Sequence, residues 1–521
     1  MLEIISIVIF YIVLIAICVI NFRHYMHMFQ LNSYHANEQL KWMGINIGSV
    51  IIRHIFTIAS IVTLLICNDV KASTLFIAAG FICFNGVFVK AKKAKKKLVF
   101  TPRVIRMCVT WGIIFTAVMV LVPLFMGFTP LSMIILCLMQ IVNLFGTIIA
   151  NVINKPIEAG VNRHYINDAK RIIKELPDLT VVGLTGSYGK TSTKFYLEKL
   201  LSAKYRVLMT PESYNTTMGV VKVVRGSLNA THEIFLCEMG AKGVGEIKEI
   251  CDIVHPKHGI ITSIGPAHLE MFKSMENIVK TKFELADSLP EDGMIVLNYD
   301  NDYIRNNPCS KIKVTYGLKG DADYTAEVLS VSEKGTQFIV RHGDESREFT
   351  TKLIGENNVQ NIVGAIAISH SLGVSFDELA LPVKRLECVP HRLQIIKGAN
   401  SVIIDDAFNS NPNGAKAALD TLAVFDGYKV LVSPGMVELG EKEYELNEKF
   451  GMQAAQVCDF CIAVGERQAV PIKAGLLKAG YPEDKIYVAK DLKDALAKAD
   501  NLKTGGKKKI ILLENDLPDN Y

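Results

Sequence analysis

Five apolar segments within the first 150 residues limit the folds that this part of the chain can adopt. A run of about 20 apolar residues is long enough to cross a bilayer as a helix, and lipid leaves no solvent to satisfy any other open backbone. The segment around Arg53 and His54 is interrupted by these two residues, which would lie near an interface or face a neighbouring helix. We therefore expect an α-helical membrane region over residues 1–175, with about five helices at 4–22, 46–67, 73–89, 107–127 and 130–150.

The charges of the chain are divided unevenly at about residue 175. Residues 1–175 hold 17 Lys and Arg against 6 Asp and Glu, whereas the remainder holds 40 against 46. Six of the lysines lie between Lys90 and Lys97. The positive-inside rule places this run in the cytoplasm, and five spans then place everything after residue 150 there too. We predict a multi-pass protein of the cell membrane with cytoplasmic catalytic domains. Anionic lipid headgroups are the expected counter-charge of the lysine run, in preference to nucleic acid.

The rest of the chain alternates short β-branched runs with amphipathic segments, which indicates α/β domains with parallel sheets. Strands are predicted in LTVVGLTG, HEIFLCEMGA, HGIITSIG and GMIVLNYD, and a small antiparallel patch is predicted between about 311 and 352. These segments form a predicted central domain at 176–384. Five further strand candidates, SVIIDDAF, YKVLVSPG, FCIAVGE, KIYVA and KKIILLEND, predict a second α/β domain at 385–521.

A glycine-rich segment between a predicted strand and a predicted helix is the sharpest chemical signal. It runs GLTGSYGKT from Gly183 to Thr191. Its glycines allow a tight turn whose amides point at a phosphate at the positive end of the next helix. Lys190 would hold the β- and γ-phosphates of ATP, and Thr191 would offer its hydroxyl to Mg²⁺. Leu184 stands where the strict GxxxxGK(S/T) pattern requires glycine. The residues predicted to bind the nucleotide here are Gly186, Ser187, Gly189, Lys190, Thr191 and Ser192.

Three further residues that can serve catalysis follow predicted strands. Glu238 ends one strand, His268 follows the next, and Lys282 lies fourteen residues beyond His268. Ligands of open parallel sheets collect outside the carboxyl ends of the strands, so these residues could converge on the glycine loop. A glutamate and an imidazole suit divalent ions bound to ATP. Taken singly, Glu238 could be a helix N-terminal charge, His268 a cap or core histidine, and Lys282 part of a solvated face.

Eight ordered blocks resemble those of the Mur ligase family and cover roughly residues 180–515. The similarity is greatest to the members that add D-alanyl-D-alanine to a UDP-muramoyl tripeptide. That family's glycine loop also lacks glycine at the first position. The resemblance implies a central phosphate-loop domain and a Rossmann-like C-terminal domain. The blocks are GLTGSYGKTSTK, YNTTMGV, EMGAKGVGEI, SIGPAHLEMFKS, ENNVQNIVGAIAI, PHRLQ, IDDAFNSNPNGAKAAL and GMVELG.

The resemblance also implies roles for individual residues. Glu238 and His268 match ligands of two Mg²⁺ ions, and Lys282 stands where many members carry a carbamylated lysine. The remaining matches are Asn358 and Asn361 at the adenine pocket, Arg392 and Asp406 reaching the nucleotide from the C-terminal domain, and Asn409 and Asn411 in the block that faces the incoming amine. Without the family match, Asn358 and Asn361 would be interpreted as a helix cap and a surface amide.

The expected activity is an ATP-dependent amide ligation, in which a carboxylate attacks the γ-phosphate and an amine then attacks the resulting acyl phosphate. The expected substrates are a UDP-muramoyl peptide and D-alanyl-D-alanine or a similar amine, in cell-wall peptidoglycan synthesis. Nothing in 1–175 resembles the family's UDP-sugar-binding domain, so a lipid-linked or polymer carboxylate is the first alternative, and a separate protein could present the substrate. A non-enzymatic membrane sensor that binds ATP is the second alternative.

Overall fold

The chain forms two compact units, Met1–Arg163 and His164–Leu517, which we call the helical unit and the α/β unit. The computed structural model describes residues 1–87, 97–212, 214–408, 410–437 and 439–516. Most of the lysine run that we expect in the cytoplasm therefore lies outside the described residues.

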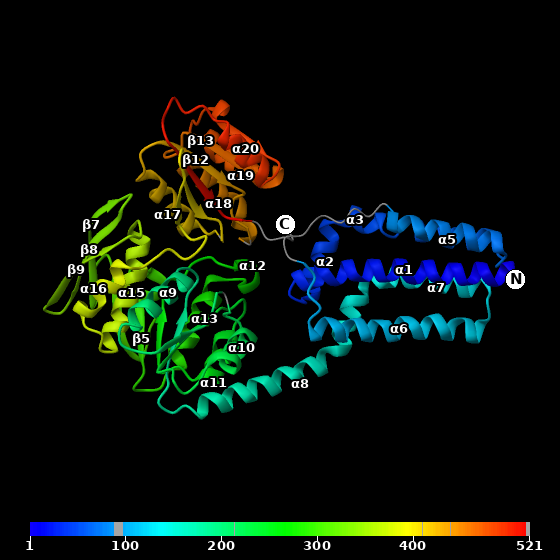
Figure 1. Cartoon of the computed structure of the whole chain (residues 1–521), viewed down its shortest axis with the longest axis horizontal. Helices are drawn as coiled ribbons and strands as arrows, with labels where there is room; N and C mark the ends of the chain where they lie inside the picture. Colours follow the sequence, from blue (N-terminus) through cyan, green and yellow to red (C-terminus); the bar gives the residue numbers. More distant parts are fainter. Residues whose placement is uncertain (88–96, 213, 409, 438, 517–521) are drawn as a thin grey trace. The chain divides into compact units, whose positions relative to one another are not determined.

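The helical unit consists of helices whose long members lie side by side (Figure 1). Leu14, Leu64, Trp111 and Leu136 are among the residues of its buried apolar core. Its elements are α1 (Leu2–Leu31), α2 (Ala36–Ile45), α3 (Ile47–Ile52), α4 (Ile55–Cys67), α5 (Ala72–Val87), α6 (Pro102–Met126), α7 (Pro130–Val142), the 3₁₀ turn η1 (Asn143–Phe145) and the first part of α8 (Gly146–Lys174).

Within the described residues, three helical stretches are long and apolar enough to cross a membrane: Leu2–Leu31, Pro102–Met126 and Pro130–Lys174. The prediction of one span over 46–67 is wrong, because the chain breaks at Arg53 and His54 between α3 and α4. The 13 residues of α4 reach only about 20 Å, less than the roughly 30 Å hydrocarbon core of a bilayer. The part of α5 that the structure describes, 16 residues, is also shorter than the hydrocarbon core.

Large apolar side chains cover much of the outer surface of the helical unit. Ile66, Ile113, Leu124 and Phe125 each expose well over half of their surface. An apolar surface of this extent would be costly in water and is typical of a membrane or protein contact.

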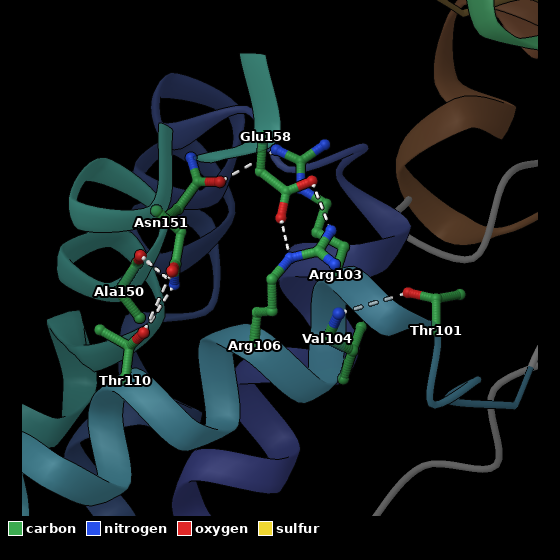
Figure 2. A network of polar contacts seen from close by, with 9 residues as sticks. Thr101, Arg103, Val104, Arg106, Thr110, Ala150, Asn151 and Glu158 are labelled. Carbon is green, nitrogen blue, oxygen red and sulfur yellow. Dashed lines mark hydrogen bonds and ion pairs between the residues drawn. The ribbon is translucent and has the colours of Figure 1, made fainter. Parts of the chain in front are cut away.

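Polar contacts join α8 to the N-terminal part of α6, as Figure 2 shows. Both oxygens of Glu158 accept hydrogen bonds from Arg106, at 2.7 Å from Nε and 2.9 Å from Nη2. Arg103 donates to Asn151 Oδ1 at 2.9 Å, and its guanidinium lies over the ring of Tyr34. The helical unit thus supplies partners for both of these arginines.

A nine-stranded sheet forms the first half of the α/β unit, in the order β2-β3-β1-β4-β5-β6-β7-β8-β9. The strands from β2 to β7 pair in parallel, and β7, β8 and β9 pair antiparallel. The predicted antiparallel patch is confirmed as a continuation of the main sheet. Its strands are β1 (Thr180–Thr185), β2 (Val207–Met209), β3 (Ile234–Glu238), β4 (His258–Ile261), β5 (Met294–Asn298), β6 (Ile312–Gly317), β7 (Tyr324–Ser332), β8 (Gly335–His342) and β9 (Glu345–Thr351).

Two apolar clusters cover the faces of this sheet. One contains Leu197, Ile362 and Leu379, and the other contains Val220 and Ile278. Each helix buries one apolar stripe against the strands, as expected for a parallel sheet covered on both sides. The helices are α9 (Lys190–Leu201), α15 (Glu356–Ser371) and α16 (Phe376–Lys384) on the first side, with α10 (Thr217–Ser227), α11 (Glu246–Val254), α12 (Leu269–Phe272) and α13 (Met275–Asp287) in the second cluster, and α14 (Asp302–Arg305) after β5.

A six-stranded sheet forms the second half of the α/β unit, in the order β10-β11-β15-β12-β13-β14. The five predicted strands are confirmed, and β10, which pairs antiparallel with β11, was not predicted. The elements are β10 (Gln394–Lys397), β11 (Ser401–Asp406), α17 (Pro412–Ala423), β12 (Tyr428–Ser433), η2 (Gly440–Lys442), α18 (Glu443–Ala454), β13 (Phe460–Val464), α19 (Glu466–Lys478), η3 (Glu483–Lys485), β14 (Ile486–Ala489), α20 (Leu492–Asp500) and β15 (Lys509–Glu514).

Candidate active site

The glycine loop joins the buried strand β1 to the N-terminus of α9. Gly189 has φ +80° and immediately precedes the helix. A Cβ on Gly189 would lie 2.6 Å from Asn361 Oδ1, and one on Gly186 would lie 2.2 Å from Thr262 Oγ1. These approaches are too close for any side chain, so both positions require glycine.

The segment after β4 holds the glycine loop in place. Ser187 N donates to Ser263 O at 2.6 Å, and the Ser187 hydroxyl donates to Gly265 O at 3.0 Å. The Thr262 hydroxyl donates to Tyr188 O at 2.6 Å. Ser187 therefore stabilises the conformation of the glycine loop, and the segment after β4 holds the loop in place before a nucleotide binds.

Lys190 folds its side chain back over the glycine loop. Its ammonium donates to Gly186 O at 2.6 Å and to Ser187 O at 3.2 Å. Burial lowers the pKa of Lys190 to about 8; the charge of Glu238 opposes this shift, and that of Arg392 adds to it. A cation at the positive end of a helix suits phosphate oxygens, which could replace the carbonyl groups as its partners.

Glu238 is buried at the end of β3 and contacts α9. Its Oε1 accepts hydrogen bonds from Thr191 Oγ1 at 3.2 Å and from Asn215 Nδ2 at 3.1 Å. Its Oε2 lies 2.9 Å from Lys194 Nζ but accepts no well-directed hydrogen bond. Burial raises the pKa of Glu238, but the charges of Lys194 and Lys190 outweigh it, so the pKa lies below its usual range. The carboxylate is therefore ionised and lies beside Thr191.

Lys194 is a component of this cluster that the sequence interpretation missed. It is completely buried, and its ammonium also donates to Glu212 O at 2.6 Å. The available signal was its spacing of four residues from Lys190, which places both lysines on one face of α9.

His268 and Lys282 follow β4. His268 has φ +52° and stands at the N-terminal boundary of α12, although its side chain makes no capping hydrogen bond there. Lys282 is buried on α13 rather than solvated. Burial and the charge of Lys190 lower its pKa to about 7, while Glu246 and Glu284 oppose the shift. Lys282 and Lys190 thus lie within electrostatic range of each other.

The two asparagines of α15 make different contacts with α9. Asn358 is buried, accepts a hydrogen bond from Tyr196 at 2.8 Å and donates to Ile354 O at 2.9 Å. It is therefore neither a helix cap nor a surface amide. Asn361 accepts from Thr193 Oγ1 at 3.2 Å, next to Gly189. Ser192 lies in the first turn of α9, beside Thr191.

Arg392 and Asp406 lie near each other at the start of the C-terminal sheet. The Arg392 guanidinium lies 4.4 Å from the ring centre of Phe408, and Asp406 Oδ1 accepts a hydrogen bond from Leu393 N at 3.1 Å. Burial raises the pKa of Asp406 to about 6, against the charge of Arg392. Burial lowers the pKa of Arg392, while the charges of Asp406 and Glu238 oppose this. Arg392 therefore lies within electrostatic range of the carboxylate beside the glycine loop.

The block expected to face the amine is described only in part. Asn411 caps α17 by accepting a hydrogen bond from Gly414 N at 2.9 Å, whereas Asn409 lies outside the described residues. Ser410 is buried and hydrogen bonds Glu514 at the end of β15. Glu514 also accepts from Ser433 Oγ at 3.0 Å, so it links the loop after β11 to the end of β12. The sequence interpretation missed Glu514. Its position as an acidic residue at the end of the apolar strand β15 was the available signal.

Asn447 organises the loop after β12. Its Oδ1 accepts from Met436 N at 2.8 Å, and its Nδ2 donates to Met436 O at 2.9 Å. The side-chain amide of Asn447 thus satisfies both backbone groups of Met436, as a neighbouring strand would, and so fixes the conformation of the loop.

The donor set beside the glycine loop suits Mg²⁺ bound together with a nucleotide. Across the described parts of the chain there is no group of three or more His, Cys, Asp or Glu side chains that could hold a metal by themselves. The ionised Glu238 carboxylate and the Thr191 hydroxyl provide only oxygen atoms. Mg²⁺ commonly binds one or two carboxylates and completes its shell with phosphate oxygens and water. This part of the site fits that pattern.

Comparison with known proteins locates the chain in a family. Residues 184–369 match the Mur ligase middle domain, and residues 391–513 match the domain described as Mur ligase, glutamate ligase domain. The chain is 30% identical over 331 residues to the UDP-N-acetylmuramoyl-tripeptide–D-alanyl-D-alanine ligase of Escherichia coli, covering 61% of this chain and 73% of that protein. The chain belongs to the Mur ligase family.

Other Mur ligases give a consistent picture. The Bacillus subtilis ligase of the same name is 34% identical over 286 residues, covering 54% of this chain. This chain spans 62% of that relative's length. The crystal structure of MurF ligase from Thermotoga maritima in complex with ADP superposes with a TM-score of 0.61 and 26% identity, covering 68% of this chain and 80% of that one. The family matches begin at residue 184, after the helical unit.

Proposed function

We propose that this chain is an ATP-dependent ligase that joins D-alanyl-D-alanine, or a similar amine, to the carboxylate of a UDP-muramoyl peptide in peptidoglycan synthesis. The observation that carries the proposal is the glycine loop, where Lys190 and Thr191 lie against the ionised Glu238 within a Mur ligase fold. The curated relatives named above carry this activity in their names.

The residues of the chain act on the γ-phosphate and its surroundings. Amides of the glycine loop and Lys190 stabilise negative charge as the carboxylate attacks in line. Mg²⁺, held by Glu238 and Thr191, would withdraw charge from the phosphate oxygens. The amine then attacks the acyl phosphate, an amide bond forms, and phosphate leaves with ADP as the other product. Arg392 and Asp406 would hold the nucleotide from the C-terminal side, and Asn409 and Asn411 would face the amine.

Lys282 is proposed to carry a carbamate, and His268 to contribute to a second Mg²⁺ site. The support from geometry is the buried position of Lys282 and its lowered pKa of about 7, because an amine must be neutral to react with carbon dioxide. A carbamate would turn a buried cation into an anion and remove the repulsion between Lys282 and Lys190.

The helical unit is proposed to anchor the ligase as a multi-pass protein of the cell membrane, with the α/β unit in the cytoplasm. The length and apolar surface of α1, α6 and α7–α8 support an anchor. The same observation favours one second candidate, the same chemistry on a lipid-linked carboxylate at the membrane surface. A separate substrate-presenting protein would be needed only if the soluble precursor does not bind unaided.

A single assay separates these candidates. The full-length protein in detergent is supplied with ATP, Mg²⁺, UDP-muramoyl tripeptide and D-alanyl-D-alanine, and ADP release is measured with each substrate omitted in turn. We expect release that requires both substrates, together with a product of the summed mass less water. If ADP appears only when membrane lipid extract replaces the UDP-linked substrate, the lipid-linked candidate is correct and the first is wrong.

A further inference from the structure

Arg53 is a buried cation without a counter-charge. It lies at the break between α3 and α4, and only 4% of its surface is exposed. Its guanidinium makes no hydrogen bond or ion pair with any residue that the structure describes, and its Nε is enclosed. The acidic residues of the segment 1–87 are Glu3, Glu38 and Asp69, and none of them pairs with it.

Aromatic and imidazole groups surround this arginine. The Tyr25 hydroxyl lies 2.9 Å from His54 Nε2, and both side chains are buried. Arg53 lies within electrostatic range of His24, Tyr25 and His54. The ring of His24 lies 5.8 Å from that of Trp42. His54 Nδ1 is also buried without a partner, so two polar groups at this position lack the bonds that burial demands.

Two half-buried arginines of the helical unit, Arg103 and Arg106, have side-chain partners. Arg106 donates to both oxygens of Glu158, and Arg103 donates to Asn151 Oδ1 (Figure 2). The Arg103 guanidinium also lies over the Tyr34 ring. A buried charge that loses its partner strongly destabilises a fold. Arg106 has a carboxylate partner, whereas Arg53 has none among the described residues, so Arg53 could take an anionic ligand as its partner.

The surface beside Arg53 indicates what kind of partner this is. The neighbours of Arg53 along the chain, Ile51, Ile52, Ile55 and Ile58, each expose about half of their surface. A ligand at this position therefore meets a cationic fork and an adjacent apolar surface together. The guanidinium fork matches the oxygen atoms of phosphate, and basic pockets among apolar helices bind phosphate headgroups.

We propose that Arg53, with Tyr25 and His54 beside it, binds the phosphate group of a membrane amphiphile whose hydrocarbon chain lies along the exposed isoleucines of α3 and α4. This site lies in the helical unit and is independent of the ligase chemistry. It supplies the negative charge that the fold lacks at Arg53, and it gives the helical unit a ligand of its own.

The test uses the fluorescence of Trp42 in the full-length protein in dodecyl maltoside, a detergent without phosphate. The chain has two tryptophans, so Trp111→Phe leaves Trp42, close to His24, as the reporter. The protein is titrated with dioleoyl phosphatidate, with oleate and with inorganic phosphate. We expect saturable binding of phosphatidate, at least tenfold tighter than either oleate or inorganic phosphate. Equal binding of oleate would overturn recognition of phosphate, and equal binding of inorganic phosphate would overturn the amphiphile.

Two variants assign the binding to Arg53. Arg53→Gln should raise the half-saturating concentration of phosphatidate at least tenfold. Arg23→Gln, which removes an exposed arginine of α1, should leave this concentration unchanged. Arg53→Lys keeps the charge but loses the fork, and it should weaken binding at least threefold if the glutamine variant does not fold. Unchanged binding in a folded Arg53 variant would overturn the proposal, as would an equal loss in the matching Arg23 variant.

Discussion

The ammonium group of Lys194 lies 2.9 Å from the carboxylate of Glu238, and both side chains are almost completely buried. Glu238 is the last residue of strand β3, whereas Lys194 lies one turn beyond Lys190 on α9. The ion pair therefore ties the helix that begins at the glycine loop to the strand end that carries the carboxylate. It also keeps Glu238 ionised, which is the form that can bind a metal ion.

Replacing Lys194 by methionine should destabilise the central domain. The change leaves the Glu238 carboxylate buried without its cation, and the loss of one partner of a buried pair costs about 3–5 kcal/mol. The free energy of opening of β3 can be measured by native-state hydrogen exchange. Lys199→Met, at an exposed position of the same helix, is the matched control and should change it little. A Lys194→Met protein as stable as the control would contradict the structural role of the pair.

Replacing Lys190 by alanine should abolish most of the ATP turnover. Its ammonium now lies on the carbonyl groups of Gly186 and Ser187, where it is placed to meet phosphate oxygens. Loss of one group that stabilises transition-state charge typically costs about 100-fold or more in rate. ADP release should fall by at least that factor, while the thermal unfolding temperature changes little. Unaltered turnover would count against the whole ligase proposal.

Bicarbonate should activate the enzyme through Lys282. The pKa of Lys282 is lowered to about 7, so the amine is mostly protonated near pH 6 and mostly neutral near pH 8, where it can react with carbon dioxide. ADP release should therefore rise with added bicarbonate at pH 8 and much less at pH 6. Lys282→Met should lose this response, whereas Lys280→Met, exposed on the same helix, should retain it. A response that survives in Lys282→Met would refute the carbamate.

The stability of the C-terminal domain should depend on the protonation of Glu514. Burial raises the pKa of Glu514 from 4.5 to about 8, while hydrogen bonds with Ser410 and Ser433 oppose this. The folded chain thus keeps a proton that the unfolded chain releases. The contribution of this proton to the free energy of unfolding is fully present below pH 4.5 and is lost progressively as the pH rises towards about 8.

Glu514→Gln provides the measurement. Glutamine keeps the shape and a hydrogen-bonding capacity of the neutral acid but does not titrate. Hydrogen exchange of β15 should show the wild type losing stability relative to Glu514→Gln as the pH rises from about 5 to about 8. Parallel pH profiles of the two proteins would show that Glu514 is not protonated in the folded chain.

Local patterns were sufficient for much of the fold. The run of β-branched residues before Gly183 and the amphipathic segment after Gly189 predict β1, the glycine loop and α9, because strand, turn and helix here depend on neighbouring residues. The same holds for β11, β12, β13, β14 and β15. The short strands β2 and β10 were not predicted, because three or four residues carry too little periodicity and form strands only by pairing with β3 and β11.

The sequence by itself determined the apolar helical start, the two α/β domains and the glycine loop with Lys190 and Thr191, because these follow from hydropathy, periodicity and conformational preference along the chain. Tertiary structure decided which polar groups are paired. The sequence does not show which partners Lys194 and Arg53 have. Folding buries Lys194 beside Glu238, and it buries Arg53 near Tyr25 and His54 without a counter-charge among the described residues. The free energy of a charge depends on its burial and on partners distant in the sequence, and neither is encoded locally.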